Sequence, residues 1–181
     1  QAYLAEEIGT ALAALGFTFT IHPNPKAPYG PLLVATRHEG GALPTVLMYG
    51  HGDVIRGQEE QWRSGLSPWK IVIEGEKMYG RGTADNKGQH SINIAALAQV
   101  LVARGGRLGF NATWLFETGE ETGSPGLAEF CAEHRAELDR VARDSSARLA
   151  SVAQAHVEQE DRAAAEHREA LEAALAGANA A

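Results

Sequence analysis

The apolar residues of the first 130 positions follow two spacings, one typical of helices and one typical of strands. Residues 4–15 place leucine and isoleucine on one helical stripe, and residues 91–103 carry a longer helical pattern that is followed by glycines. Short apolar runs at 31–35, 45–49 and 111–116 are flanked by turn-forming or polar residues, which is typical of buried strands. The alternation predicts an α/β fold in which helices flank a mostly parallel sheet.

The chain changes character near Phe130. All 12 aromatic residues, all seven prolines and 19 of the 20 glycines lie at or before this position. The residues that follow are rich in Ala, Glu and Arg, which favour a helix and leave little apolar surface to bury. We therefore expect a folded α/β unit over residues 1–135 and an Ala-rich helical tail over residues 136–181.

Composition excludes several classes of protein. The chain has 16 basic and 23 acidic residues, a net charge of -7, and so lacks the basic excess that nucleic-acid binding requires. Its single cysteine, Cys131, excludes an internal disulfide framework and a cysteine-rich zinc module, and favours a reducing compartment. No apolar run has the length of a membrane span. We expect a soluble cytoplasmic protein that binds neither nucleic acid nor membranes.

Acidic residues and a histidine gather after three short strand-like runs, at 45–49, 77–79 and 114–116, and each group lies between glycines. They are His51 and Asp53, then Asp85, then Glu120 and Glu121. In α/β sheets, ligands bind beyond the carboxyl ends of the strands. If the three strands are neighbours, these five side chains share one crevice.

Four carboxylates and one imidazole need a counter-charge, because like charges in a partly dry site raise one another's pKa sharply. A divalent metal supplies this charge. Imidazole with carboxylates suits zinc better than calcium or magnesium, and the absence of thiolates favours a catalytic site. Asp53, two residues after His51, is well placed to hold the second ring nitrogen. Of the adjacent Glu120 and Glu121, one can bind metal while the other handles the proton of an attacking water.

Taken singly, each of these segments is compatible with an ordinary turn, helix cap or loop, so the combination carries the interpretation. Competing signatures are absent from the sequence. A dinucleotide-binding loop would need glycine where Asp85 stands, and no phosphate-binding loop follows a strand. Neither a Gly-x-Ser-x-Gly elbow nor a His-Glu-x-x-His helix occurs.

Three segments contain the residues of this crevice: MYGHGDV at 48–54, YGRGTADNKG at 79–88 and ETGEETGSPGL at 117–127. In order, spacing and strand-to-loop context they resemble the signatures of the zinc-dependent deacylases and exopeptidases. This family includes acetylornithine deacetylase, succinyl-diaminopimelate desuccinylase, aminoacylase and carnosinase-type dipeptidases. The resemblance covers about residues 1–135, and it implies that this part is an incomplete zinc exopeptidase-like catalytic domain.

The resemblance implies a site with two zinc ions. The implied metal ligands are His51 on one ion, Glu121 on the second and Asp85 bridging both. It also implies that Asp53 orients His51 and that Glu120 is the general base. Paired metals of this kind lie ~3.5–4 Å apart, polarise the scissile carbonyl and activate a shared water.

Three further properties follow from the same resemblance. The substrate would be an N-acyl amino acid or a small peptide, whose amide bond is hydrolysed. The peptide bond between Asp85 and Asn86 would be cis. The complete protein would form a homodimer through an inserted domain.

The chain departs from the family pattern after the third segment. Family members continue with more strands, the dimerisation domain and a late metal-binding histidine. They also carry a further acidic ligand downstream of the glutamate pair. Asp144 lies at the corresponding distance from Glu121, although its surroundings are those of a helix rather than of a strand. We therefore expect a truncated or frameshifted product, or an excerpt, that binds one zinc ion or none and whose activity is doubtful.

Two alternatives remain open at this point. One is a non-catalytic binding module that keeps the scaffold and recruits a partner through the tail. The other is a single-metal hydrolase that uses His51, Asp85 and Glu121 as ligands and Glu120 as the base.

Overall fold

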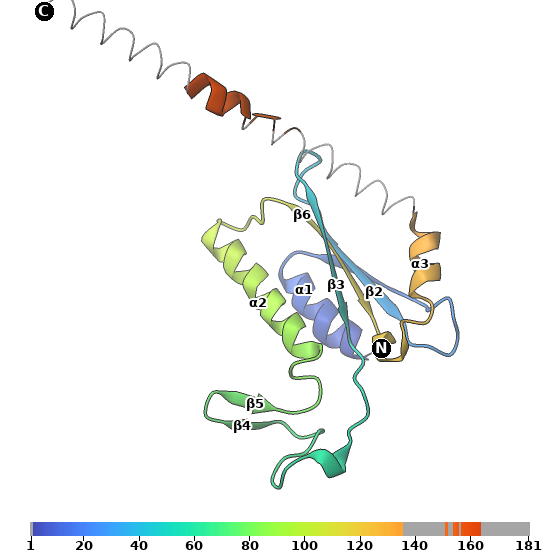
Figure 1. Ribbon diagram of the computed structural model, residues 1–181. Helices are drawn as coiled ribbons and strands as arrows, with labels where there is room; N and C mark the ends of the chain where they lie inside the picture. The colour runs from blue at the N-terminus through green and yellow to red at the C-terminus, as the bar shows by residue number, and fades with distance from the viewer. Residues whose placement is uncertain (1, 136–150, 152–153, 156, 164–181) are drawn as a thin grey trace, which may run out of the picture.

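The computed structural model describes residues 2–135, 151, 154–155 and 157–163 of the chain. The helical elements are η1 (Tyr3–Gly9), a π-helical segment that continues into α1 (Thr10–Ala14), η2 (Glu59–Gln61), α2 (Lys87–Ala103), η3 (Glu120–Thr122) and α3 (Leu127–Glu133). The strands are β1 (Thr18–His22), β2 (Leu32–Arg37), β3 (Thr45–His51), β4 (Val72–Glu74), β5 (Lys77–Tyr79) and β6 (Asn111–Glu117). Figure 1 shows the sheet with helices on either side, which confirms the α/β class.

The main sheet has four strands in the order β1-β2-β6-β3. The apolar runs predicted a mostly parallel sheet, and this prediction is wrong. Strand β2 is antiparallel to both β1 and β6, and only β3 and β6 run parallel. The reason is the length of the connections. A turn-rich loop returns β1 to β2, whereas the long segment between β3 and β6 includes α2 and allows a parallel crossover. The carboxyl ends of this parallel pair carry the residues of the predicted crevice except Asp85. The three strands are not all neighbours, because Asp85 follows β5, which pairs with β4 in a separate two-stranded sheet.

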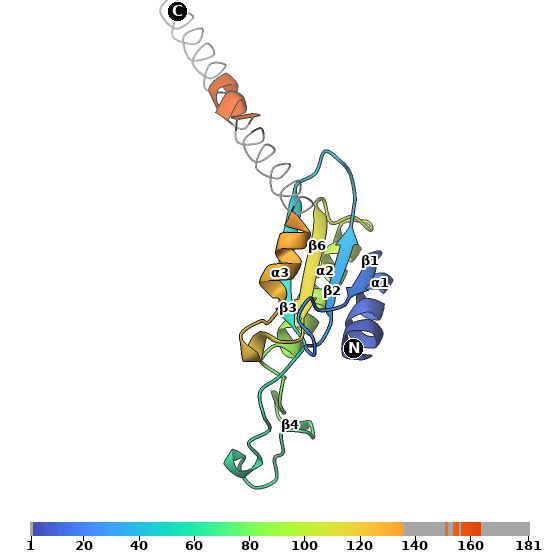
Figure 2. The same ribbon diagram turned by 90° about the vertical axis from the view of Figure 1, so that its right-hand side faces the viewer.

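The core lies mainly on one face of this sheet, against the N-terminal helix and α2. Its buried side chains are Leu4, Ile8, Leu12, Phe17, Leu33, Ala35, Leu97, Leu108, Ala112, Trp114 and Phe116. On the other face, Phe130 of α3 packs against Leu32 and Leu115. In Figure 2 the strands are seen between α3 on one side and α1 on the other. Burial on both faces holds β6 rigidly, which fixes the positions of the residues at its carboxyl end.

Only part of the predicted tail lies within the described residues. Residues 151, 154–155 and 157–163 are helical and exposed, and the rest of the tail, including Asp144, lies outside the described part. The domain boundary near residue 135 therefore stays a prediction. Among the described residues, no helix has the length and apolar character needed to cross a membrane.

Candidate metal centre

The carboxyl ends of β3 and β6 lie side by side. In the parallel register His51 is paired with Glu117, and the amide N–H of Gly52 donates to the carbonyl of Glu117 at 2.8 Å. The strand can pass close to α2 at this point because Gly50 has no side chain. A Cβ atom at Gly50 would lie 2.5 Å from Nε2 of His90. The local sequence Gly-His-Gly therefore places the imidazole of His51 at the sheet edge with only 5% of the residue exposed.

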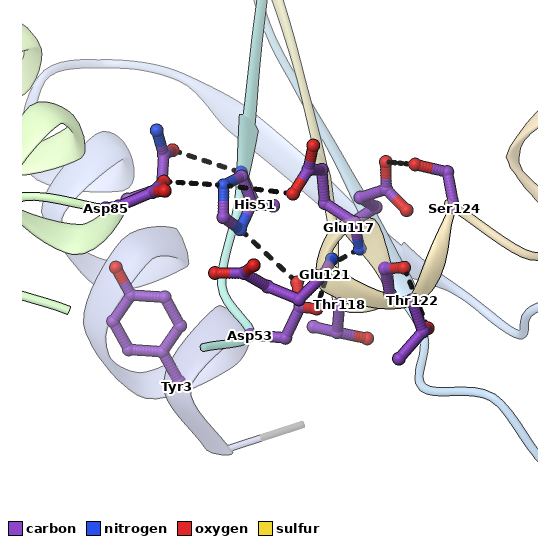
Figure 3. Close-up of polar contacts among 12 residues, drawn as sticks. Tyr3, His51, Asp53, Asp85, Glu117, Thr118, Glu121, Thr122 and Ser124 are labelled. Atoms are coloured by element: carbon purple, nitrogen blue, oxygen red, sulfur yellow. Dashed lines mark hydrogen bonds and ion pairs between the residues drawn. The ribbon is translucent and has the colours of Figure 1, made fainter. Parts of the chain in front are cut away.

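The two nitrogens of His51 face different carboxylates, as Figure 3 shows. Nε2 lies 3.0 Å from Oδ1 of Asp85 and 3.7 Å from Oε2 of Glu120. Nδ1 lies 3.4 Å from Oδ1 of Asp53, within ion-pair range but without hydrogen-bond geometry. The ring is thus held between carboxylates from three separate segments of the chain.

Asp53 also holds the loop that follows β6. Its carboxylate oxygens accept the backbone N–H of Glu120 at 3.3 Å and the backbone N–H of Glu121 at 3.1 Å. These amides belong to η3, the short helical turn that carries both glutamates. One aspartate therefore connects the histidine with both glutamates.

Asp85 lies just before α2, and the next residue, Asn86, contacts β3. The side-chain oxygen of Asn86 accepts the backbone N–H of His51 at 3.2 Å. The Asp85–Asn86 peptide bond is cis, as the family resemblance implies. This segment brings the exposed carboxylate of Asp85 to the buried ring of His51.

Three of the four predicted ligands converge. One donor atom each from His51, Asp85 and Glu121 lies within 4.8 Å of the other two. Imidazole with carboxylates is a donor set that suits zinc, and the residues present fit a divalent cation. The fourth predicted ligand, Asp144, lies outside the described residues. The carboxylate of Glu120 borders the same cluster and is 44% exposed, so water can reach it.

Glu117 contributes to the site although the sequence pattern gave it no role. Glu117 is only 3% exposed, and its Oε1 accepts hydrogen bonds from the hydroxyls of Tyr49 at 2.5 Å and Ser124 at 2.7 Å. Burial is the main cause that raises the pKa of Tyr49 well above its usual value, and the hydrogen bond to Glu117 is the second cause. The hydroxyl of Tyr49 therefore stays a donor. The signal in the sequence was an acidic residue that directly continues an apolar run.

His90 is a second residue whose position could not be inferred from the sequence. It is 1% exposed beneath Gly50, and a hydrogen bond of 2.9 Å joins its Nδ1 to the hydroxyl of Tyr3. Burial lowers the pKa of His90 to about 4, with a smaller contribution from the nearby charge of His51. His90 is therefore neutral at physiological pH and supports the histidine strand through packing.

An open cavity of about 620 Å³ adjoins the cluster. Its lining includes Asp53 and Glu121 of the site, together with Tyr29 and Arg56. Of the site's carboxylates, those of Asp53 and Glu121 are therefore accessible to a small molecule from this side.

A histidine–carboxylate cluster at the end of neighbouring α/β strands is typical of metal-dependent hydrolases. The model of Peptidase family M20/M25/M40 matches residues 47–170, and this chain belongs to that family.

Named relatives agree with this membership. A succinyl-diaminopimelate desuccinylase of Rhizorhabdus wittichii is 39% identical over 95 residues, which cover 51% of this chain and 24% of the relative. An acetylornithine deacetylase of Pasteurella multocida is 34% identical over 102 residues, covering 56% of this chain and 25% of the relative. The crystal structure of human carnosine dipeptidase 1 matches with a TM-score of 0.64 and 27% identity, covering 72% of this chain and 29% of the other. The chain thus spans about a quarter of the length of the curated relatives it matches.

Proposed function

We propose that this chain forms part of a zinc-dependent hydrolase that cleaves the amide bond of an N-acyl amino acid or a small peptide. The observation that carries the proposal is the convergence of His51, Asp85 and Glu121 within 4.8 Å of one another, with Glu120 beside them. Membership of the peptidase family supports it. The names of the relatives, a desuccinylase and a deacetylase, favour a hydrolase over a non-catalytic binding module.

In this proposal His51, Asp85 and Glu121 would hold the metal. From the family resemblance, Asp85 would serve both ions of a two-metal site. A bound zinc ion would polarise the scissile carbonyl and lower the pKa of water. Asp144 is proposed as a further ligand, and it lies outside the described residues. We also propose, from the family resemblance, that the complete protein is a homodimer. The single cysteine of this chain favours a cytoplasmic location.

Glu120 is the proposed general base. Its carboxylate is partly exposed and lies 3.7 Å from Nε2 of His51, so it borders both solvent and the ligand cluster. It would take a proton from the attacking water while the water oxygen adds to the carbonyl carbon. As the C–N bond breaks, the same carboxyl group would return that proton to the leaving amine nitrogen.

Asp53 is the proposed orienting residue for His51. Its oxygen faces Nδ1, which leaves Nε2 directed towards Asp85 and available to a metal. A carboxylate in this place fixes both the tautomer and the direction of a ligating imidazole. The same carboxylate holds the amides of Glu120 and Glu121, so it would set the distance between the ligand and the base.

The test is hydrolysis of N-acetyl amino acids and dipeptides by the purified 181-residue chain with added zinc. We expect Glu120→Gln to abolish turnover while leaving zinc binding intact, because this residue handles the proton. The matched control is Glu60→Gln at an exposed position away from the cluster. Turnover that survives Glu120→Gln at the wild-type rate would contradict the proposed base.

A further inference from the structure

Glu117 carries a buried carboxylate that no step above uses. It is the last residue of β6, and burying a carboxylate is costly unless hydrogen bonds satisfy it. Both of its donors are side-chain hydroxyls that meet the same oxygen, from Tyr49 at 2.5 Å and from Ser124 at 2.7 Å. Hydrogen bonds to an ionised acceptor are stronger than those between neutral groups. The carboxylate is therefore a strong connection between two segments that are far apart in sequence.

The two segments are those that carry the candidate metal site. Tyr49 lies on β3, two positions before His51. Ser124 closes the loop that begins at Glu117 and includes Glu120 and Glu121. Figure 3 shows the Glu117 side chain between the histidine strand and Ser124. The backbone of Glu117 makes a second connection, because its carbonyl accepts the N–H of Gly52.

The loop is thus held from both sides. On one side Asp53 accepts the amides of Glu120 and Glu121, and on the other side Glu117 accepts the hydroxyl of Ser124. Ser124 has a φ of 53°, in the left-handed region that few residues other than glycine adopt. Such a conformation persists only where the surroundings impose it, and the bond to Glu117 is one contact that does so.

We propose that Glu117 is a positioning residue of the metal centre: through Tyr49 and Ser124 it fixes the distance between His51 and the Glu120–Glu121 loop. The inference rests on the proposed function, and it adds a residue to which neither the sequence motif nor the cluster of donor atoms gives a role. Glu117 acts through its neighbours and does not itself contact metal or substrate. Loss of its carboxylate would let the loop move away from His51, so that the donor atoms no longer meet around one cation.

The experiment measures zinc affinity by competition with a chelating dye, and the visible spectrum of the cobalt form, on the full 181-residue chain. For Glu117→Ala we expect a loss of zinc affinity of roughly tenfold or more and a changed cobalt spectrum, as for other residues that support metal ligands. Glu117→Gln keeps an oxygen that can accept both hydroxyls, so we expect it to restore most of the affinity. Thermal unfolding of each metal-free variant is recorded alongside.

The matched control is Glu39→Gln. Glu39 is another buried carboxylate, which accepts the amides of Leu108 and Gly109 near the opposite end of β6. Its substitution should lower the unfolding temperature and leave zinc affinity and the cobalt spectrum unchanged. An equal loss of affinity in Glu39→Gln would overturn the inference, because the effect would then reflect general destabilisation.

Wild-type zinc affinity and cobalt spectrum in Glu117→Ala would also overturn it. Where that variant fails to unfold cooperatively, Ser124→Ala decides instead, because it removes one hydroxyl and leaves the carboxylate with Tyr49. Ser124→Ala should weaken zinc binding and change the spectrum in the same direction, and wild-type values would overturn the inference. Absence of metal binding by the wild-type chain is a different result, which contradicts the proposed metal centre itself.

Discussion

The carboxylate of Asp53 lies 3.4 Å from Nδ1 of His51, while Nε2 of the same ring faces Asp85 at 3.0 Å. Since Asp53 follows His51 by two residues, a short segment of chain places both the imidazole and the group that orients it. Asp53 also accepts two amides of the glutamate loop, which gives it a second task that its place in the sequence does not reveal.

Replacing Asp53 with alanine should therefore weaken zinc binding more than an ordinary surface substitution. The variant loses the group that faces Nδ1 of His51 and the acceptor for two loop amides. We expect a loss of affinity of roughly 10- to 100-fold in a competition titration. Glu76→Ala, on the exposed turn between β4 and β5, is the control. If Asp53→Ala and Glu76→Ala bind zinc equally well, Asp53 does not support the site.

Gly50 should not tolerate a side chain. A Cβ atom there would lie 2.5 Å from Nε2 of the buried His90, so the strand or the imidazole must move. Overpacking of this kind costs roughly 1–3 kcal/mol, and here it also displaces the neighbouring His51. Urea unfolding and zinc titration of Gly50→Ala should both show losses. Gly41→Ala is the matched control, because nothing lies within 4 Å of the added atom; equal behaviour of the two variants would contradict the packing described for Gly50.

The stability of the metal-free chain should depend on pH through His90. Burial lowers the folded pKa of His90 from 6.5 to about 4, so the unfolded chain binds a proton at His90 more readily than the folded chain does. Stability is then retained above about pH 6.5 and is lost as the pH falls towards 4, by up to about 3 kcal/mol.

The measurement is urea unfolding of the wild type and of His90→Gln across this pH range. The variant keeps a polar group near Tyr3 and lacks the titrating ring, so its curve should fall less steeply between these values. Parallel curves for the two proteins would show that His90 does not titrate in this way.

The local elements of the fold follow from the sequence better than their pairing does. The apolar spacing at 91–103 predicts most of α2, which begins earlier, at Lys87. The pattern misses the first turn of the helix because its residues are polar and show no apolar stripe. The run at 45–49 predicts β3, which continues to His51. The direction of β2 could not be predicted, because strand pairing depends on contacts between residues distant in the chain.

The candidate site divides in a similar way. His51, Asp85 and Glu121 were predictable because each lies in a glycine-containing segment directly after a strand-like run. The structure brings their donor atoms together. Glu117 and His90 were not, because their importance comes from burial and from partners on other segments. The roles of Glu120 as the base and Asp53 as the orienting group stay predictions, as does the role of Asp144.

The number of zinc ions distinguishes the one-metal from the two-metal form of the proposal. The three donor atoms within 4.8 Å can meet at one cation, and a second ion would need further ligands besides Asp85 and Glu121. We expect the described residues to support one tightly bound zinc ion per chain. Equilibrium dialysis with metal analysis gives this ratio directly, and two tightly bound ions per chain would favour the complete two-metal site.

The central claim is that His51, Asp85 and Glu121 together hold a divalent cation. Its most direct test is a zinc titration of the wild-type chain beside His51→Ala, Asp85→Ala and Glu121→Ala, each first checked for cooperative unfolding. We predict saturable binding by the wild type and a large loss of affinity in each folded variant, because each substitution removes one donor. Wild-type affinity in all three variants, or no zinc binding by the wild type, would contradict it.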